Sequence, residues 1–276
     1  MKENSKKNQI KYFDKINSRL VFIEQKADMN YWDNLWQNKS KNIRYKKRLP
    51  KHNPYLNTTK KYLSPGNIIL EGGCGLAENS HNFKLAGYNP IALDYAEKTI
   101  LFLKEHAPQV NPIIGDVTDL DLDDESIHGY WSFGVIEHFY EGYAPISMEA
   151  KRVIKKGGYF FVTFPHMSKL RKLKAFFNFY PIWSEEMGKE SFYQFALDKK
   201  SVIKHCSSLG FVLQETQDLG GFLGLVNEIK FGRRLRKSMN NSNNIIVRII
   251  RKILDTITST FSSHITLLVF KKISIK

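Results

Sequence analysis

Two glycines and two carboxylates lie close together between residues 67 and 94, and their spacing is typical of a site that binds a nucleoside. Gly73 and Gly75 follow a short apolar run that ends at Glu71, and Asp94 follows a second apolar run after a helical stretch. Glycine is needed where the chain turns sharply and its backbone approaches a ligand, because a Cβ atom would hinder both. A carboxylate at the end of the second strand can accept hydrogen bonds from both hydroxyls of a ribose, each worth about 1.5 to 3 kcal/mol. The segment therefore predicts a strand, a glycine turn, a helix, a strand and a ribose-binding acid.

The glycine spacing distinguishes between two kinds of nucleoside cofactor. A dinucleotide fingerprint requires a third glycine, and Glu78 stands at that place, where its carboxylate would repel a pyrophosphate. The spacing acidic-x-Gly-x-Gly, with Glu71 as the acid, instead resembles the first motif of the class I S-adenosylmethionine-dependent methyltransferases. Ala77 departs from that motif at its last glycine. A sulfonium cofactor has no phosphate and tolerates nearby carboxylates, so the turn suits S-adenosyl-L-methionine.

The resemblance continues along the chain in the family's order, through residues 113–117, 127–139 and 155–165. It implies that Glu71 lies near the methionine ammonium group and that Asp94 binds the ribose. Further cofactor contacts would come from Tyr95 on the adenine face, Asp116 and Val117 at the adenine edge, and Phe133 and Gly134 beside the methionine amine. Asp116 has a second interpretation, as a cap of the strand end before residues 119–125.

The order of apolar runs predicts an α/β fold. From residue 63 to residue 165 strands alternate with helices, which requires a parallel sheet with helices on both faces. The resemblance implies a doubly wound, Rossmann-like sheet of seven strands, six of them parallel. The last strand, near residues 264–270, would be antiparallel at the sheet edge. Ligands are expected at the carboxyl ends of the parallel strands.

Three segments flank or interrupt this predicted domain of residues 63–276. Residues 1–62 are expected to form a basic helical arm, with helices over 12–26 and 31–37, that folds over the cofactor as in many methyltransferases. The insertion 166–197 is rich in aromatic residues and is interpreted either as a substrate cap or as an added pair of core helices. The second insertion, 222–263, is basic.

Positive charge is concentrated at the two ends of the chain. The net charge is +15, yet residues 1–62 hold 16 Lys+Arg against 5 Asp+Glu and residues 222–276 hold 11 against 2. The middle of the chain is acidic, so a general richness in lysine, which is the alternative explanation, does not account for the pattern alone. The basic ends are expected to meet an anionic partner.

Residues 245–261 predict an amphipathic helix, because their apolar and basic residues separate on a helical wheel. Two interpretations remain open. The apolar face packs on the domain, as such faces usually do, or it contacts an anionic membrane surface or a lipid-linked substrate. Basic residues just upstream, Arg233, Arg234, Arg236 and Lys237, favour the second.

Methyl transfer depends mainly on aligning the acceptor behind the methyl carbon, and a base is needed only if the acceptor must lose a proton. The candidate bases at predicted strand ends are His138, Glu137 and His166. His138 is preferred, since a neutral imidazole can accept a proton from a hydroxyl or amine near pH 7. The alternative is that Glu137 and His138 only shape their loop.

The acceptor is expected to be a small or lipid-linked molecule, such as a sugar, a quinone precursor or a secondary metabolite. The motifs for methylating nucleic-acid bases are absent from the sequence, so nucleic acid is disfavoured. Cys74 and Cys206 predict neither a metal site nor a disulfide framework, and without a recognisable signal peptide or membrane span a cytoplasmic location is expected. Two other functions are a non-catalytic methyltransferase-like binding protein and a nicotinamide-dependent reductase.

Overall fold

The computed structural model describes residues 10–24, 26–187, 189–229, 232 and 244–273. They form two compact parts. The core part comprises Ala27–Val162, Lys204–Gln214 and Val269–Lys276. The second part comprises Met1–Lys26, Thr163–Ile203 and Glu215–Leu268.

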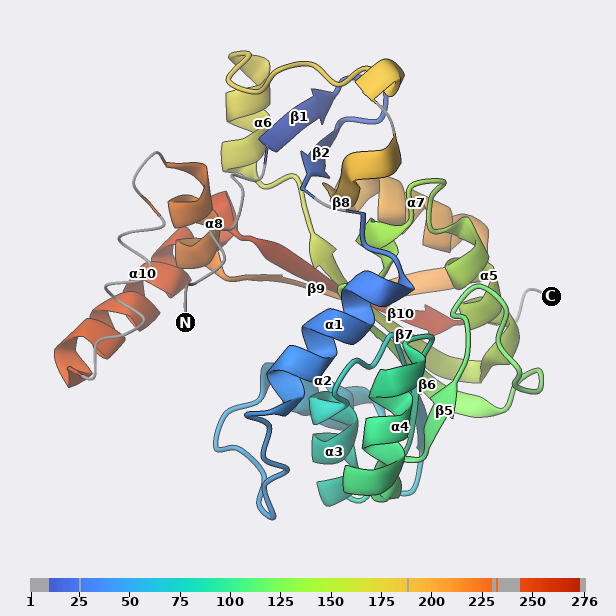
Figure 1. The fold of residues 1–276 in the computed structure, drawn as a ribbon. Coiled ribbons are helices and arrows are strands. Elements are labelled where there is room, and N and C mark those ends of the chain that lie inside the picture. The colour runs from blue at the N-terminus through green and yellow to red at the C-terminus, as the bar shows by residue number, and fades with distance from the viewer. Residues whose placement is uncertain (1–9, 25, 188, 230–231, 233–243, 274–276) are drawn as a thin grey trace. The chain divides into compact units, whose positions relative to one another are not determined.

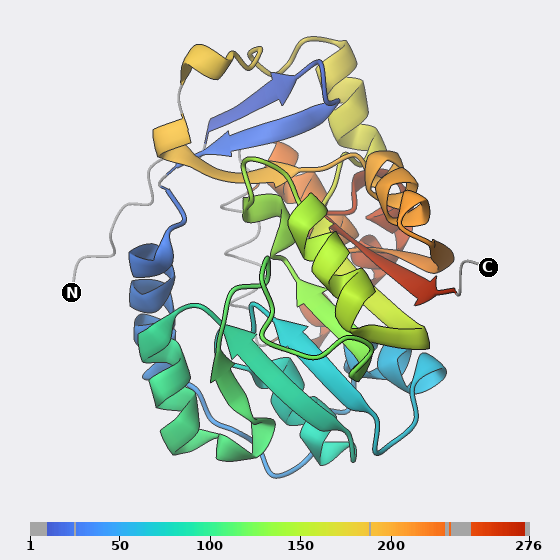
Figure 2. The same ribbon diagram turned by 90° about the vertical axis from the view of Figure 1, so that its right-hand side faces the viewer.

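A seven-stranded sheet confirms the predicted α/β fold (Figure 1). Its strands lie in the order β5-β4-β3-β6-β7-β10-β9. The last strand of the chain, β10, runs antiparallel to the others (Figure 2), but it lies between β7 and β9. The prediction that the last strand forms the sheet edge was therefore wrong, and β9 lies at that edge. The strands are β3 (Ile68–Gly72), β4 (Asn89–Asp94), β5 (Pro112–Ile114), β6 (Ile127–Phe133), β7 (Ile154–Pro165), β9 (Phe211–Leu219) and β10 (Ile265–Lys272).

The register of the parallel strands brings their carboxyl ends to one level. Gly72 at the end of β3 pairs with Leu93 of β4 and with Ser132 of β6. Asp94 of β4 pairs with Ile114 at the end of β5. The loops that follow these four strands therefore start side by side, which is where ligands bind in open α/β sheets.

The helices of the core part begin and end close to local sequence signals. Asn53 caps the helix that starts with Pro54, and its side chain accepts a hydrogen bond from the Leu56 amide at 3.0 Å. Asp28 caps the first helix in the same way. The helices of both parts are α1 (Met29–Ser40), α2 (Pro54–Tyr62), α3 (Glu78–Leu85), α4 (Glu97–His106), α5 (Ala144–Val153), α6 (Lys169–Phe176), α7 (Lys199–Ser208), α8 (Gly221–Glu228) and α10 (Ile245–Ser262).

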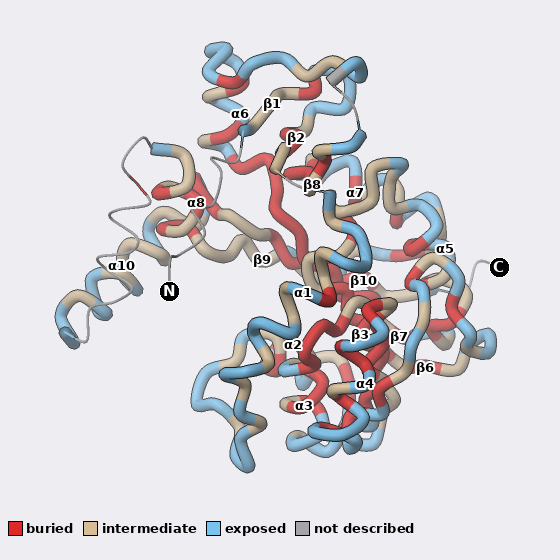
Figure 3. Tube along the Cα trace, viewed as in Figure 1, coloured by how far each residue is buried: buried red, intermediate tan, exposed pale blue. Residues whose placement is uncertain are grey.

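Trp131 of β6 organises the core beneath the strand ends. Its indole is buried and lies parallel to the rings of Phe133 and Phe161, at centroid distances of 4.4 and 4.5 Å. The indole N–H donates to Thr59 Oγ1 of α2 at 3.0 Å, so the polar atom of this large side chain is satisfied. Figure 3 shows the buried segments concentrated along the strands of the sheet.

The N-terminal segment differs from its prediction. Residues 12–26 do not form a helix; β1 (Ile10–Asp14) and β2 (Arg19–Ile23) form an antiparallel hairpin. Asp14 fixes the turn, since its carboxylate accepts hydrogen bonds from the Asn17 amide at 3.1 Å and from Arg19 Nε at 2.9 Å. The predicted helix over residues 31–37 is confirmed by α1.

The insertion 166–197 pairs with this hairpin. Its strand β8 (Phe192–Ala196) extends the hairpin into a three-stranded sheet in the order β1-β2-β8. Side chains of the hairpin and the insertion, including Leu20, Phe22 and Tyr180, share one buried apolar cluster. The alternative of an added pair of core helices is wrong, because the described residues of the insertion form a single α-helix, α6, two short 3-10 helices and one strand.

A buried carboxylate joins several elements of the second part. The Glu228 side chain is 1% exposed and lies 2.7 Å from Lys11 Nζ, 3.1 Å from Arg171 Nε and 2.8 Å from Lys174 Nζ. Burial alone would raise the pKa of Glu228, but these cations outweigh it and bring the pKa to about 2. Burial lowers the pKa of Lys11, although Glu228 acts in the opposite direction. The cost of burying the Lys11 ammonium group therefore offsets part of the stabilisation that its ion pair with Glu228 gives. Because the other cations and the Tyr180 hydroxyl also bind Glu228, the carboxylate is stabilised in its ionised form.

The predicted amphipathic helix of residues 245–261 is confirmed as α10. Of the two interpretations of its apolar face, packing on the domain is wrong. Isoleucines along one face are 45 to 68% exposed. Arg233, Arg234, Arg236 and Lys237 lie outside the described residues. Among the described residues, no helix is long and apolar enough to cross a membrane.

Candidate functional site

A cavity of about 620 Å³ opens at the carboxyl ends of β3, β4, β5 and β6, and its lining belongs to the core part. Cavities of this size typically hold nucleoside-sized ligands. Nine of the residues predicted from the sequence line it: Glu71, Gly73, Asp94, Tyr95, Asp116, Val117, Phe133, Gly134 and His138.

The glycine turn after β3 forms the floor of the cavity. Gly73 has a φ of +72°, and a Cβ atom there would lie 2.5 Å from Val135 Cγ2. Gly75 has a φ of +50°, and its Cβ would lie 2.6 Å from the Trp36 ring. Ala77, where the family motif has its last glycine, also adopts a left-handed conformation with a φ of +50°. The backbone thus keeps the glycine-type turn, with a strained alanine at its end.

Asp94 connects this turn to the neighbouring strand. Its carboxylate accepts a hydrogen bond from the Gly75 amide at 2.8 Å and another from the Ala96 amide at 2.9 Å. Burial raises the pKa of Asp94, and these two amides oppose the rise. Each carboxylate oxygen has a second lone pair, so Asp94 can hold the turn and still accept ligand hydroxyls. Gly75 does not line the cavity. Its amide contributes to the site indirectly, by holding the Asp94 carboxylate in place.

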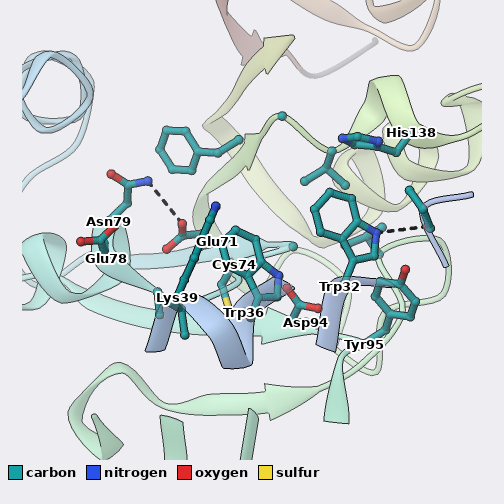
Figure 4. Close-up of a pocket in the computed structure, with 18 of the residues that line it drawn as sticks. Trp32, Trp36, Lys39, Glu71, Cys74, Glu78, Asn79, Asp94, Tyr95 and His138 are labelled. Carbon is teal, nitrogen blue, oxygen red and sulfur yellow. Dashed lines mark hydrogen bonds between the residues drawn. The ribbon is translucent and has the colours of Figure 1, made fainter. Parts of the chain in front are cut away.

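Glu71 lies at the inner end of the cavity, at 2% exposure. Its carboxyl group accepts hydrogen bonds from the Ser80 amide at 2.8 Å and from the Ser80 hydroxyl, while the Asn79 amide is 3.5 Å away (Figure 4). Burial raises the pKa of Glu71 to about 7 against these donors. A cation beside Glu71 would favour its ionised form.

The loop after β5 carries Asp116 and Val117 into the lining. Asp116 is exposed, and its Oδ1 accepts hydrogen bonds from the Thr118 amide at 2.8 Å and the Thr118 hydroxyl at 2.7 Å. This oxygen therefore closes a turn at Thr118, immediately before the run 119–125 that the cap interpretation named. This turn does not exclude a ligand contact, since the residue also faces the cavity.

Helix α1 contributes two tryptophans and a lysine that the sequence interpretation did not identify. Trp32 and Trp36 stack with their ring centroids 6.0 Å apart, and Lys39 Nζ lies 4.4 Å from the Trp36 centroid (Figure 4). The side chains of Asp33 and Thr99 anchor α1 on α4 through a contact of 3.4 Å. Tryptophans four residues apart on a predicted helix were the available signal, because such residues share one helix face.

The three candidate bases have different surroundings. His138 lines the cavity with its ring edge-on to Trp32, at 4.9 Å between centroids. Glu137 is 3% exposed and does not line the cavity; burial raises its pKa to about 8, and its Oε2 has no hydrogen-bond partner among the described residues. A Cβ atom on Gly134 would lie 3.2 Å from Glu137 Oε1, so the Gly134 backbone packs closely against this carboxyl group.

His166 belongs to the second part and is not among the residues that line the cavity. Its Nε2 lies 2.8 Å from Ser263 Oγ and 3.8 Å from Asp218 Oδ1. Burial lowers the pKa of His166 to about 4, although Asp218 acts in the opposite direction. The imidazole is therefore neutral at physiological pH and its polar partners belong to the second part.

The charges of the lining favour a cationic ligand. Among the described residues, four carboxylic acids (Glu71, Glu78, Asp94 and Asp116) and one lysine (Lys39) line the cavity. A pyrophosphate would meet repulsion there, whereas a sulfonium and an ammonium group would be attracted. In the described part of the chain no cluster of side chains has the composition of a metal site.

Residues 70–162 match the family described as "Methyltransferase domain". These residues thus form a methyltransferase domain, and the relatives that resemble the chain are described as S-adenosylmethionine-dependent methyltransferases. A Mycolicibacterium smegmatis protein, described as a "Probable S-adenosylmethionine-dependent methyltransferase", is 33% identical over 101 residues. That match covers 37% of this chain and 39% of the relative, so the similar stretch is less than half of either chain.

Solved structures agree with the methyltransferase fold. An S-adenosylmethionine-dependent methyltransferase of Archaeoglobus fulgidus superposes with a TM-score of 0.54 at 18% identity, covering 79% of this chain and 91% of its own. One from Mesorhizobium loti has a TM-score of 0.54 at 13% identity and covers 78% and 96% of the two chains. Similarity at this identity establishes the fold alone.

Proposed function

We propose that the protein transfers a methyl group from S-adenosyl-L-methionine to a hydroxyl or amine of a small or lipid-linked acceptor. The observation that carries the proposal is the acidic lining of the cavity around a left-handed glycine turn, with Asp94 hydrogen-bonded to that turn. The same charges argue against a nicotinamide dinucleotide, whose pyrophosphate would lie against the turn.

The residues of the cavity fit the cofactor in the positions that the family resemblance implies. Asp94 accepts the ribose hydroxyls, and Glu71 faces the methionine ammonium group. Gly73 lets the turn pack against Val135, because a Cβ atom at this position would collide with the Val135 side chain. The indoles of Trp32 and Trp36 offer flat apolar surfaces that exclude water from the bound ligand.

S-adenosylmethionine supplies a methyl group whose bond to a positively charged sulfur breaks as an acceptor lone pair forms the new bond, leaving S-adenosylhomocysteine. The protein has to orient the acceptor for this in-line displacement. His138 accepts the proton that a hydroxyl or amine acceptor releases, since it lines the cavity with its ring edge-on against Trp32. Glu137 is a weaker base candidate, because with a pKa of about 8 it is mostly protonated at pH 7.

The experiment is a screen of acceptors for release of S-adenosylhomocysteine. Sugars, phenols, amines and lipid-linked alcohols are incubated with the protein and S-adenosylmethionine. Product release that the Asp94→Ala variant loses and an Asp123→Ala variant keeps supports the proposal, since Asp123 is exposed and outside the cavity. Cofactor binding without turnover on any acceptor class would favour a binding protein.

A further inference from the structure

Helix α10 exposes a continuous apolar face. At about 100° per residue, its large apolar side chains cover an arc of about 160°. They are 42 to 68% exposed, and α10 lacks buried segments over almost its whole length (Figure 3). The residues are Ile245, Ile246, Ile249, Ile250, Ile253, Ile257 and Phe261. A face of this size on a soluble protein indicates an interaction surface.

The opposite side of α10 packs on α8 and fixes the orientation of the exposed face. Gly221 and Gly224 allow the two helices to approach closely, since added Cβ atoms would contact the backbone of Ser259 and Ser262. The Ser262 hydroxyl donates to the Gly221 carbonyl at 2.8 Å. The Phe222 amide donates to Asp255 Oδ1 at 3.0 Å. Rotating α10 to bury its isoleucines would break these polar contacts, so the apolar face is directed outward by the packing itself.

The surroundings of this face carry positive charge. On the wheel, Lys252 lies about 20° and Arg248 about 60° from the edge of the apolar arc, and both side chains are exposed. From residue 229 to residue 254 the sequence has no acidic residue. Of its eight basic residues, Arg248, Arg251 and Lys252 belong to α10, whereas Lys230, Arg233, Arg234, Arg236 and Lys237 lie outside the described residues. Long basic side chains at the rim of an apolar face can reach lipid phosphates while their stems stay in the apolar layer.

We propose that α10 docks the protein on an anionic lipid bilayer. The helix would lie in the plane of the membrane surface, with its isoleucine face between the headgroups and acyl chains and its basic rim at the phosphates. Eighteen residues give a helix about 27 Å long, enough for an extended surface contact. A second copy of the chain is a poorer partner, because pairing two such faces brings their basic rims together. The docking does not depend on the proposed methyl transfer.

The test is cosedimentation of the full chain with lipid vesicles. We expect binding to vesicles of phosphatidylcholine with about one third phosphatidylglycerol, and weaker binding to phosphatidylcholine alone. The double variant Ile249→Ser, Ile253→Ser should lose affinity by about tenfold or more, since each isoleucine exposes about half of its surface for burial in lipid. Ile16→Ser is the matched control: Ile16 is 93% exposed but lies in the β1–β2 turn, so its replacement should change nothing.

The contribution of charge to vesicle binding is tested with the double variant Arg248→Gln, Lys252→Gln, which should bind anionic vesicles more weakly and leave binding to neutral vesicles unchanged. Added salt should also weaken binding to anionic vesicles. A second readout uses a polarity-sensitive label on Ile257→Cys, which is feasible because both native cysteines are buried. Its emission should shift to the blue on anionic vesicles, and that of labelled Ile16→Cys should not.

Three outcomes would overturn the proposal. The wild-type chain does not sediment with anionic vesicles, or the isoleucine variant sediments as well as the wild type. Alternatively, the wild type forms dimers in solution that the isoleucine variant dissociates, which would make the face an interface between copies. S-adenosylhomocysteine binding by each variant, measured alongside, shows that the methyltransferase domain is folded and keeps this test separate from that of the proposed function.

Discussion

Cofactor affinity should depend on pH through Glu71. Burial raises the pKa of Glu71 to about 7, so about nine-tenths of the molecules carry the carboxylate at pH 8 and about one-tenth at pH 6. If the bound ammonium group requires the carboxylate, affinity falls about tenfold from pH 8 to pH 6, or about 1.4 kcal/mol. The free energy of unfolding depends on pH in the opposite direction to the cofactor affinity. A raised carboxyl pKa favours folding most below pH 4.5, and this contribution is lost as the pH rises through 7, so cofactor should protect the fold most at pH 8.

The assay is calorimetric titration of S-adenosylhomocysteine at pH 6, 7 and 8, in buffers with different heats of ionisation. At pH 7 binding should release about half a proton. The Glu71→Gln variant is the control: it keeps an acceptor for the Ser80 amide but cannot ionise, so its affinity should be nearly independent of pH. An affinity that is constant from pH 6 to pH 8 in the wild type, or uptake of protons on binding, would refute this role of Glu71.

Three further predictions concern single side chains. Gly73→Ala should weaken S-adenosylhomocysteine binding by about tenfold or more in calorimetry, because Gly73 has a φ of +72° and an added Cβ atom would collide with Val135. Gly142→Ala is the control: Gly142 has a φ of +104° but open space around it, so the affinity should be unchanged. Glu228→Gln should lower the free energy of unfolding in urea by about 3 kcal/mol, and since the pKa of Glu228 is about 2, this stabilisation should be present above pH 4.5 and vanish toward pH 2; an equal loss at both extremes would contradict it. His138→Ala should reduce kcat by about 10² to 10⁴ with cofactor affinity retained, and unchanged turnover would show that no base acts there.

The glycine turn and the strand ends could be predicted because their signals are local. Gly73 stands where the backbone is left-handed, and Asp94 ends a strand whose parallel register brings it beside the turn. Ala77 also follows local logic: the family's glycine position is left-handed here although this chain has alanine. Such features depend on backbone geometry within one strand–turn–helix unit, which the sequence encodes directly.

The features that depend on contacts distant in sequence were not predictable. The hairpin over residues 10–23 is stabilised by β8, about 170 residues away, and its turn chemistry at Asp14 was mistaken for part of a helix. Periodicity predicted α10, but the wheel does not show which face has a partner. The polar side of α10 packs on α8 because glycines there permit close contact, a preference that hydrophobicity alone does not reveal.

The central claim is that a sulfonium nucleoside binds over the glycine turn with its ribose at Asp94. Calorimetric titration of S-adenosylhomocysteine into the wild type and the Asp94→Ala variant tests it most directly, with Asp123→Ala as control. We predict one bound ligand per wild-type and control chain, and an affinity lower by about a hundredfold or more in Asp94→Ala, since two charged hydrogen bonds are lost. Absence of binding to the wild type, or equal affinity in Asp94→Ala, would contradict the claim.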